Sequence, residues 1–146
     1  MVILIASDHA GFDLKELLSE RARDIGHEVV DLGPPSRDSV DYPDYAHDLA
    51  RRIAAGEADF GVLICGTGIG MCMAANRHAG VRAALCHDAF TAEMARRHND
   101  ANVLCMGGRT TGPGLAIQML DIFLATPFNG GRHERRVEKI ELKGES

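Results

Sequence analysis

The sequence has no excess of positive charge. Its 16 lysines and arginines face 21 aspartates and glutamates, which gives a net charge of −5 over 146 residues. General nucleic-acid binders and proteins of anionic membrane surfaces rely on a positive field, so we expect neither nucleic acid nor a membrane as a partner. Residues 128–146 nevertheless carry a net charge of +1, against −6 for residues 1–127. An anionic ligand is therefore expected near the basic residues of the C-terminal part, around Arg132 to Arg136.

The sequence also lacks the spacings that mark zinc sites, disulfide frameworks and membrane spans. Its four cysteines form no C-x-x-C pair, and its histidines form no H-x-x-x-H pair, so we expect no metal. The longest uncharged stretch, residues 60–76, contains four glycines and falls short of the ~20 apolar residues that a membrane span requires. No basic region precedes the short apolar stretch at the N-terminus, so no signal peptide is expected. These patterns indicate a cytoplasmic protein with reduced thiols.

Short apolar runs alternate with segments of helical period along the whole chain. The alternation predicts a single α/β domain over residues 1–146, with a five-stranded, mostly parallel sheet covered by helices on both faces. We expect strands over 2–7, 28–32, 60–65, 81–86 and 102–106, and helices over 12–25, 42–55, 69–77, 89–98 and 114–125. An extra C-terminal helix is expected from Arg132 to about Lys143. With no strand after it, this helix either docks on a partner subunit or lies across its own sheet.

In an open α/β sheet, ligands bind at the carboxyl ends of the strands, and the sequence there is most informative after the third strand. Residues 65–70 read Cys-Gly-Thr-Gly-Ile-Gly, a turn whose backbone N–H groups can hold a phosphate or a developing oxyanion. The turn is not a P-loop, because no Gly-Lys-Ser/Thr follows, and it lacks the third glycine of the dinucleotide fingerprint. Asp88 has the place of an acidic ribose ligand, so a nicotinamide cofactor stays an alternative. Glycines that serve only tight packing are another.

Cys65 lies at the junction between this strand and the helix that follows. The partial positive charge of a helix start favours a thiolate, so Cys65 is a candidate base or nucleophile. The alternative for any single cysteine is a small buried hydrophobic residue, and this is what we expect for Cys72, Cys86 and Cys105. For Cys65 both interpretations stay open at this level.

Histidines stand beside polar partners at the ends of several predicted elements, which makes them candidate general acids or bases. The pairs are Asp8-His9, His87-Asp88 and His98-Asn99. The others, His27, His47 and His78, lie among helical or turn residues and are expected at the surface or in caps.

Arg132 and Arg136 are four residues apart and share one face of the predicted C-terminal helix. Two guanidinium groups at a helix start suit a phosphate monoester, because each makes paired, charge-assisted hydrogen bonds. The alternative is a solvated helix in which these arginines pair with Glu134 and Glu138.

Taken together, the motifs resemble the type B ribose-5-phosphate isomerases, which belong to a wider family with the allose-6-phosphate and galactose-6-phosphate isomerases. The resemblance runs in order over nearly the whole chain. It is carried by Asp8-His9-Ala10-Gly11, Asp41-Tyr42-Pro43, Cys65-Gly66-Thr67-Gly68-Ile69-Gly70, Ala74-Ala75-Asn76, residues 97–104, and Gly130-Gly131-Arg132-His133 with Arg136. It implies a three-layer αβα Rossmann-like sandwich that forms homodimers or tetramers with active sites at the subunit interface. It also implies aldose–ketose isomerisation through a cis-enediolate, without metal or organic cofactor.

The resemblance further implies a role for each site residue. Cys65 would be the base that moves a proton between C2 and C1, and His98, helped by Asp8, would open the furanose ring. Thr67 would assist proton transfer at the oxygens, and the backbone N–H groups from Gly66 to Gly70 would stabilise the enediolate. The substrate contacts would be Gly66, Gly68 and Gly70 through their amides, Tyr42 and Asn99 at the sugar hydroxyls, and His9, Arg109, Arg132 and Arg136 at the phosphate, some of them from the second subunit.

Three places in the chain bear on this transfer. A branch of the family without the cysteine uses a carboxylate base one helical turn on, where this chain has Met71, so Cys65 is expected to be the base. Residues 110–113 match no family motif, and His133 matches one without a clear role. We expect ribose 5-phosphate and ribulose 5-phosphate as substrates. A six-carbon sugar phosphate such as allose 6-phosphate, or a non-catalytic phosphate- or nucleotide-binding module, is the alternative.

Overall fold

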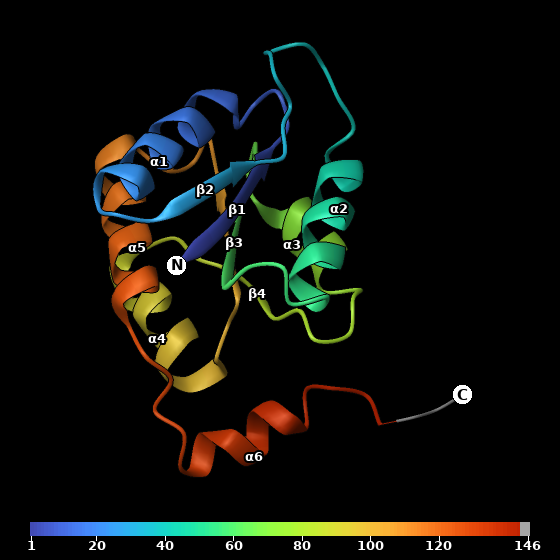
Figure 1. Ribbon diagram of the computed structural model, residues 1–146, viewed down its shortest axis with the longest axis vertical. Helices are drawn as coiled ribbons and strands as arrows, with labels where there is room; N and C mark the ends of the chain where they lie inside the picture. The colour runs from blue at the N-terminus through green and yellow to red at the C-terminus, as the bar shows by residue number, and fades with distance from the viewer. Residues whose placement is uncertain (144–146) are drawn as a thin grey trace.

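A five-stranded parallel sheet lies between two layers of helices in the computed structural model, which describes residues 1–143 (Figure 1). The strand order is β2-β1-β3-β5-β4. The predicted three-layer α/β architecture is therefore confirmed. The strands are β1 (Val2–Ser7), β2 (Glu28–Asp31), β3 (Phe60–Cys65), β4 (Ala83–Leu85) and β5 (Val103–Gly107). The helices are α1 (Phe12–Asp24), α2 (Tyr42–Ala54), α3 (Ile69–Ala75), α4 (Ala89–Asn99), α5 (Pro113–Ala125) and α6 (Arg132–Glu138).

Alternate residues of each central strand point to opposite faces, and each face has its own apolar core. Ile3 and Ile5 of β1 face α1, α4 and α5, while Leu4 and Ala6 of the same strand face α2 and α3. Because both faces are covered, the strands are continuous apolar runs rather than alternating ones, which is why the sequence shows them so clearly. In the described part of the chain, no helix has both the length and the apolarity to cross a bilayer.

Most boundaries of the elements agree with the sequence prediction within two residues, and two of the differences have a visible structural cause. The edge strand β4 is shorter than residues 81–86, because side chains take the place of strand pairing at its start. Arg82 N–H donates to Asn102 Oδ1, at 2.8 Å, and Ala83 N–H donates to Asn76 Oδ1, also at 2.8 Å.

The second difference lies at the C-terminus, where α6 ends at Glu138, so the prediction of a helix to about Lys143 is wrong. After α6 the chain turns back toward β4. Glu141 Oε1 accepts a hydrogen bond from Gly80 N–H, at 3.1 Å, and lies 3.7 Å from Arg82 Nη1. These tertiary contacts override the helical period of the sequence. The helix itself packs beside the end of α4, away from the sheet (Figure 1), so the alternative in which it lies across its own sheet is also wrong.

The chain reverses its direction of winding between β1 and β3. From β1 it proceeds to β2 on one side. From β3 it proceeds to β4 at the far edge on the other side, and then returns to β5, which lies between β3 and β4. The loops that follow β1 and β3 therefore diverge from neighbouring strand ends, which is where ligands bind in open α/β sheets. Asp8 N–H donates to Ile64 O across this point, at 3.1 Å. Gly11 packs so closely here that an added Cβ would lie 2.5 Å from Ile64 O, so only glycine fits.

Candidate active site

Cys65 is the last residue of β3, and its side chain is held by the glycine turn that follows it. The side chain is buried, and Sγ accepts a hydrogen bond from Gly68 N–H, at 3.1 Å. Gly68 has φ +80°, in the left-handed region, and an added Cβ would lie 2.8 Å from the carbonyl carbon of Met106. The turn therefore requires glycine here in order to aim its N–H at the sulfur. The turn thus aims one N–H donor at the buried sulfur and fixes the position of the thiol.

The same turn presents hydrogen-bond donors that the chain itself does not use. Among residues 1–143, no group accepts from the backbone N–H of Gly66, Thr67 or Gly70. The Thr67 hydroxyl oxygen accepts from Ile69 N–H, at 3.3 Å, which fixes this exposed side chain over the turn and leaves its own proton available to donate. Such a set of donors beside a thiol can stabilise an oxyanion formed next to the reacting carbon.

Two predicted substrate contacts reach this turn from other elements. The guanidinium of Arg109 lies against Gly66, where an added Cβ would be 3.4 Å from Nη1. The ring of Tyr42, at the start of α2, covers Gly70, where an added Cβ would be 2.8 Å from the hydroxyl oxygen. The loop after β5 is fixed in place by Arg109 N–H, which donates to Gly66 O at 3.0 Å. The structure thus brings a cation and a phenol to the edges of the Cys65 turn.

Asp8 and His9 follow β1 at the neighbouring strand end. Asp8 is buried, and its Oδ1 accepts a hydrogen bond from Gly11 N–H, at 3.0 Å, in the turn before α1. His9 Nδ1 accepts from Val40 N–H, at 3.3 Å, which connects the ring to the segment that precedes α2. Both side chains therefore belong to the carboxyl edge of the sheet, as Cys65 does.

The other predicted site residues lie at the opposite ends of the strands, near the amino end of β5. Helix α4 starts after the carboxyl end of β4 and runs back along the sheet for 11 residues, about 16 Å, so that it ends just before the amino end of β5. His98 and Asn99 are its last two residues, and Arg132 and Arg136 lie on α6 beside this end of α4 (Figure 1). Within one chain the predicted site is thus divided into two groups. The Cys65 group consists of Cys65 with the glycine turn, Asp8, His9, Tyr42 and Arg109. The His98 group consists of His98, Asn99, Arg132 and Arg136, with His133 beside them.

The His98 group is positively charged and stacked. The rings of His98 and His133 are parallel within 12°, with centroids 4.2 Å apart. Burial in this stack, together with the charges of His98 and of the two arginines that flank it on α6, lowers the pKa of His133. Neither Arg132 nor Arg136 forms an ion pair with a carboxylate in the part of the chain that the structure describes. The alternative in which they pair with Glu134 and Glu138 is therefore wrong, and both are available to an anion.

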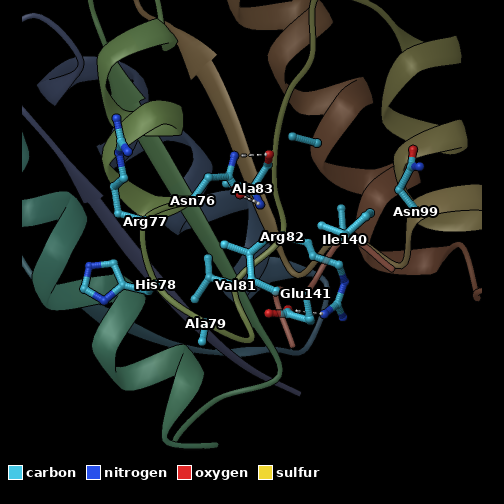
Figure 2. A pocket seen from close by; sticks show the side chains of 13 residues that line it. Asn76, Arg77, His78, Ala79, Val81, Arg82, Ala83, Asn99, Ile140 and Glu141 are labelled. Carbon is cyan, nitrogen blue, oxygen red and sulfur yellow. Dashed lines mark hydrogen bonds and ion pairs between the residues drawn. The ribbon is translucent and has the colours of Figure 1, made fainter. Parts of the chain in front are cut away.

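A pocket of about 640 Å³ lies near the His98 group but contains little of it. Figure 2 shows that it lies between the loop after α3, the start of β4 and the C-terminal segment, with Asn99 among its lining residues. The side chains drawn there mainly hold the chain together: the Asn76 amide pairs with the backbone of Ala83, and Arg82 lies beside Glu141. This pocket does not contain the thiol or the glycine turn, so it is separate from the Cys65 group.

The remaining candidates of the sequence have structural surroundings. Asp88 caps α4, with Oδ1 accepting from Thr91 N–H at 2.7 Å, and these hydrogen bonds lower its pKa. Burial raises the pKa of Cys86 to about 11, as expected of a small buried residue. Cys72 differs from that expectation: it is only partly buried, and its contact with the Cys105 thiol lowers its pKa to about 7. No three His, Cys, Asp or Glu side chains converge on a metal-binding arrangement among the described residues.

Residues 3–140 match the sequence model of the ribose/galactose isomerases. The chain belongs to this family. The ribose-5-phosphate isomerase B of Escherichia coli, a curated relative, is 45% identical over 138 residues, which cover 94% of this chain and 93% of that protein.

Solved structures of type B ribose-5-phosphate isomerases have the same fold. The protein of Thermotoga maritima is 54% identical, with a TM-score of 0.94 over 96% of this chain and 97% of that one. The protein of Mycoplasma genitalium, whose structure contains bound ribulose-5-phosphate, is 48% identical, with a TM-score of 0.92 over 95% and 93% of the two chains. The family resemblance inferred from the motifs is confirmed, and so is the prediction of an isomerase. A nicotinamide enzyme and a non-catalytic binding module are set aside, because these relatives of the ribose/galactose isomerase family are isomerases.

The sequence alone did not indicate that Lys15 is buried, or that the backbone N–H of Val40 donates a hydrogen bond to His9. The signal for Lys15 was present, since its spacing from Phe12 and Leu18 places it on the buried face of α1. Val40 contributes only its N–H group, which no sequence motif marks.

Proposed function

We propose that this isomerase interconverts ribose 5-phosphate and ribulose 5-phosphate. The observation that carries the proposal is the Cys65 thiol, 3.1 Å from Gly68 N–H, at the entrance of a turn in which the amides of Gly66, Thr67 and Gly70 have no partner in the described chain. A base beside unused N–H donors is what proton transfer next to a carbonyl requires. The Escherichia coli relative has this activity in its name, and the Mycoplasma genitalium relative binds ribulose-5-phosphate.

The reaction needs the open-chain sugar, in which C1 is an aldehyde and C2 carries an acidic proton. The Cys65 thiolate removes the proton from C2, and the electron pair moves to the carbonyl oxygen O1 to give a cis-enediolate. The N–H groups of Gly66, Thr67 and Gly70 stabilise the negative charge on oxygen. Return of the proton from Cys65 to C1, with transfer of the hydroxyl proton from O2 to O1 through Thr67, completes the ketose. In total, one proton moves from C2 to C1 and one moves from O2 to O1.

The His98 group supplies the remaining steps. His98 exchanges a proton between the anomeric hydroxyl and the ring oxygen and so opens the furanose, assisted by Asp8 at the other side of the sugar. Arg132 and Arg136 bind the phosphate dianion, because neither guanidinium is neutralised within the described chain and the two residues lie one turn apart on α6. Tyr42 and Asn99 contact sugar hydroxyls, and His9 and Arg109 complete the phosphate site.

A second copy of the chain is part of this proposal. The two groups of one chain lie at opposite ends of the strands, one at the carboxyl ends and the other near the amino ends. A five-carbon sugar phosphate is too short to bridge them. In a two-fold dimer, the His98 group of each copy lies over the Cys65 group of the other, which forms two identical sites. Exposed apolar side chains beside the glycine turn support this contact, since Ile69 is 46% exposed and Met73 is 65% exposed on α3.

Complementation between two inactive variants tests the shared site. Cys65→Ala and His98→Asn each inactivate one group, so each homodimer lacks both complete sites. Random mixing in equal amounts gives heterodimers with one intact site, and we expect about one quarter of the wild-type activity. Native mass spectrometry verifies that subunits have exchanged. An inactive mixture in which heterodimers are present would show that both groups act within one chain.

The substrate itself is tested by following ketose formation from ribose 5-phosphate and from allose 6-phosphate, in EDTA and without it. We expect faster turnover of the pentose and no effect of EDTA. Turnover of allose 6-phosphate alone would move the proposal to six-carbon sugars, and turnover of neither would remove it. Loss of activity in EDTA would contradict the metal-free reaction.

A further inference from the structure

Lys15 is a fully buried lysine outside the proposed reaction site. Its side chain is 1% exposed, and the ammonium group is surrounded by acceptors. Nζ donates to both carboxylate oxygens of Asp31, at 2.9 and 2.8 Å, to the Pro34 carbonyl at 3.1 Å, and to Glu16 Oε1 at 3.1 Å. A lysine is rarely buried unless such partners balance the loss of hydration, so this arrangement is built for a fixed geometry.

Apart from Glu16, which lies on α1 itself, the acceptors of Lys15 lie at the end of β2 and in the segment that leaves it. Asp31 Oδ1 also accepts a hydrogen bond from Gly33 N–H, at 2.8 Å, so one carboxylate holds both the lysine and the turn. Gly33 O in turn accepts from Ser7 N–H, at 3.1 Å, at the carboxyl end of β1. Lys15 therefore fixes the first residues of this segment against α1 and β1.

The far end of the same segment reaches the Cys65 group. Val40 N–H donates to His9 Nδ1, at 3.3 Å, and Tyr42 follows immediately with its ring over Gly70. Between these ends, Arg37 contacts α1 through an exposed ion pair with Asp13 and through its guanidinium, which lies 5.0 Å from the centroid of the Phe12 ring. Residues 33–41 thus form a strap between the buried lysine and two side chains of the site.

The contact with Val40 determines which nitrogen of His9 bears a proton. A backbone N–H is always a donor, so His9 Nδ1 must be unprotonated to accept it, and the neutral ring carries its proton on Nε2. His9 then presents an Nε2–H donor away from the strap. Without the strap in place, this tautomer has no structural cause.

We propose that Lys15 is a positioning residue, which acts through the strap of residues 33–41 to hold His9 in the Nε2–H form for the substrate phosphate. The inference rests on the proposed function in so far as it assigns the phosphate to His9. Asp31 is the partner through which Lys15 acts, so its amide variant should share the effect.

The test compares Lys15→Met, Lys15→Arg and Asp31→Asn with Arg37→Ala as the matched control. Lys15→Met keeps an unbranched apolar stem but has no ammonium, whereas Arg37→Ala removes the exposed ion pair of the same strap. For Lys15→Met we expect KM for ribose 5-phosphate to rise about tenfold, the factor that corresponds to one hydrogen bond to a charged group, with kcat nearly unchanged. Lys15→Arg should restore part of the loss, and Arg37→Ala should leave KM unchanged.

A second readout is independent of activity. The ¹⁵N chemical shifts of the His9 ring report its tautomer, and we expect the Nε2–H form in the wild type and a mixture of tautomers in Lys15→Met and Asp31→Asn. Unchanged ring shifts and unchanged KM in folded variants would overturn the inference. If Lys15→Met does not fold, Asp31→Asn and Lys15→Arg decide the question. If the wild type fails to isomerise ribose 5-phosphate, the proposed function fails, and the ring shifts still decide whether Lys15 fixes the tautomer.

Discussion

The Cys65 sulfur and the Gly68 amide lie 3.1 Å apart in a hydrogen bond that closes the turn after β3. This bond holds the thiol at the carboxyl edge of the sheet, between the loops that follow β1 and β5. The turn thus places a thiol and backbone N–H groups without a partner in the described chain within six residues of sequence.

Replacement of Cys65 by alanine should remove the base without disturbing the phosphate site. We expect kcat to fall by about 10²–10⁴, the range that one general base contributes, with KM nearly unchanged. Steady-state kinetics with ribose 5-phosphate measures both values. Cys65→Ser is the matched control, since it keeps a hydrogen-bond acceptor but provides a far weaker base. A Cys65→Ala variant with wild-type kcat would show that another residue is the base.

Replacement of Gly68 by alanine should destabilise the fold as well as the site. The left-handed backbone costs a residue with a Cβ about 1–2 kcal/mol, and the new Cβ would lie 2.7 Å from Leu85 Cδ1. We expect the free energy of unfolding in urea to decrease by at least that amount. Gly114→Ala is the control, because nothing lies within 4 Å of its added Cβ and alanine favours a helix. Equal stability of the two variants would contradict the strain assigned to Gly68.

Replacement of Arg136 by alanine should weaken phosphate binding. Loss of one charge-assisted contact should raise KM about tenfold to a hundredfold, while kcat changes little. The neighbouring Arg135→Ala serves as the control, since it removes the same charge from the same helix. Equal effects of both substitutions would indicate a general effect of charge rather than a specific contact.

The histidine pair of α2 and the loop after α3 should make stability depend on pH. His47 Nδ1 and His78 Nε2 lie 2.7 Å apart, and burial, followed by the charges of His47 and Arg51, lowers the pKa of His78 below 6.5. Between that lowered pKa and 6.5, the folded chain binds fewer protons than the unfolded one. Stability therefore falls as the pH falls through this window.

Urea unfolding at about pH 7.5 and about pH 5, on either side of the usual histidine range, measures this effect. We expect the wild type to lose more stability between the two values than His78→Gln, which cannot be protonated. His133 also has a lowered pKa, so the difference between the two proteins, rather than the wild-type slope, isolates His78. Identical losses would show that the pair contributes nothing.

The sequence predicted those parts of the site that are local in the chain. Cys65 ends a buried strand, and Gly66 and Gly68 come directly after it. Their place at the carboxyl ends of the strands and the N–H donors of the turn could therefore be inferred from spacing alone. The relation of His98 to Cys65 is different, because it depends on how α4 runs back along the sheet. Neither residue's neighbours in sequence contain that information.

The errors of the sequence prediction have the same physical origin. The helical period of the sequence continues past Glu138, where the helix ends. Glu141 instead contacts Gly80 and Arg82, which are about 60 residues earlier in the chain. Lys15 was overlooked because a lysine is expected at the surface, and only the fold reveals the carboxylate and carbonyl that hold it. Long-range partners decide both cases.

The separation of His98 from Cys65 along α4 has a consequence for how activity depends on concentration. In the proposed dimer every complete site crosses the contact between two chains, so an isolated chain has none. Dilution below the dissociation constant of the dimer should lower the specific activity itself, and substrate, which bridges the two chains, should strengthen their association by mass action.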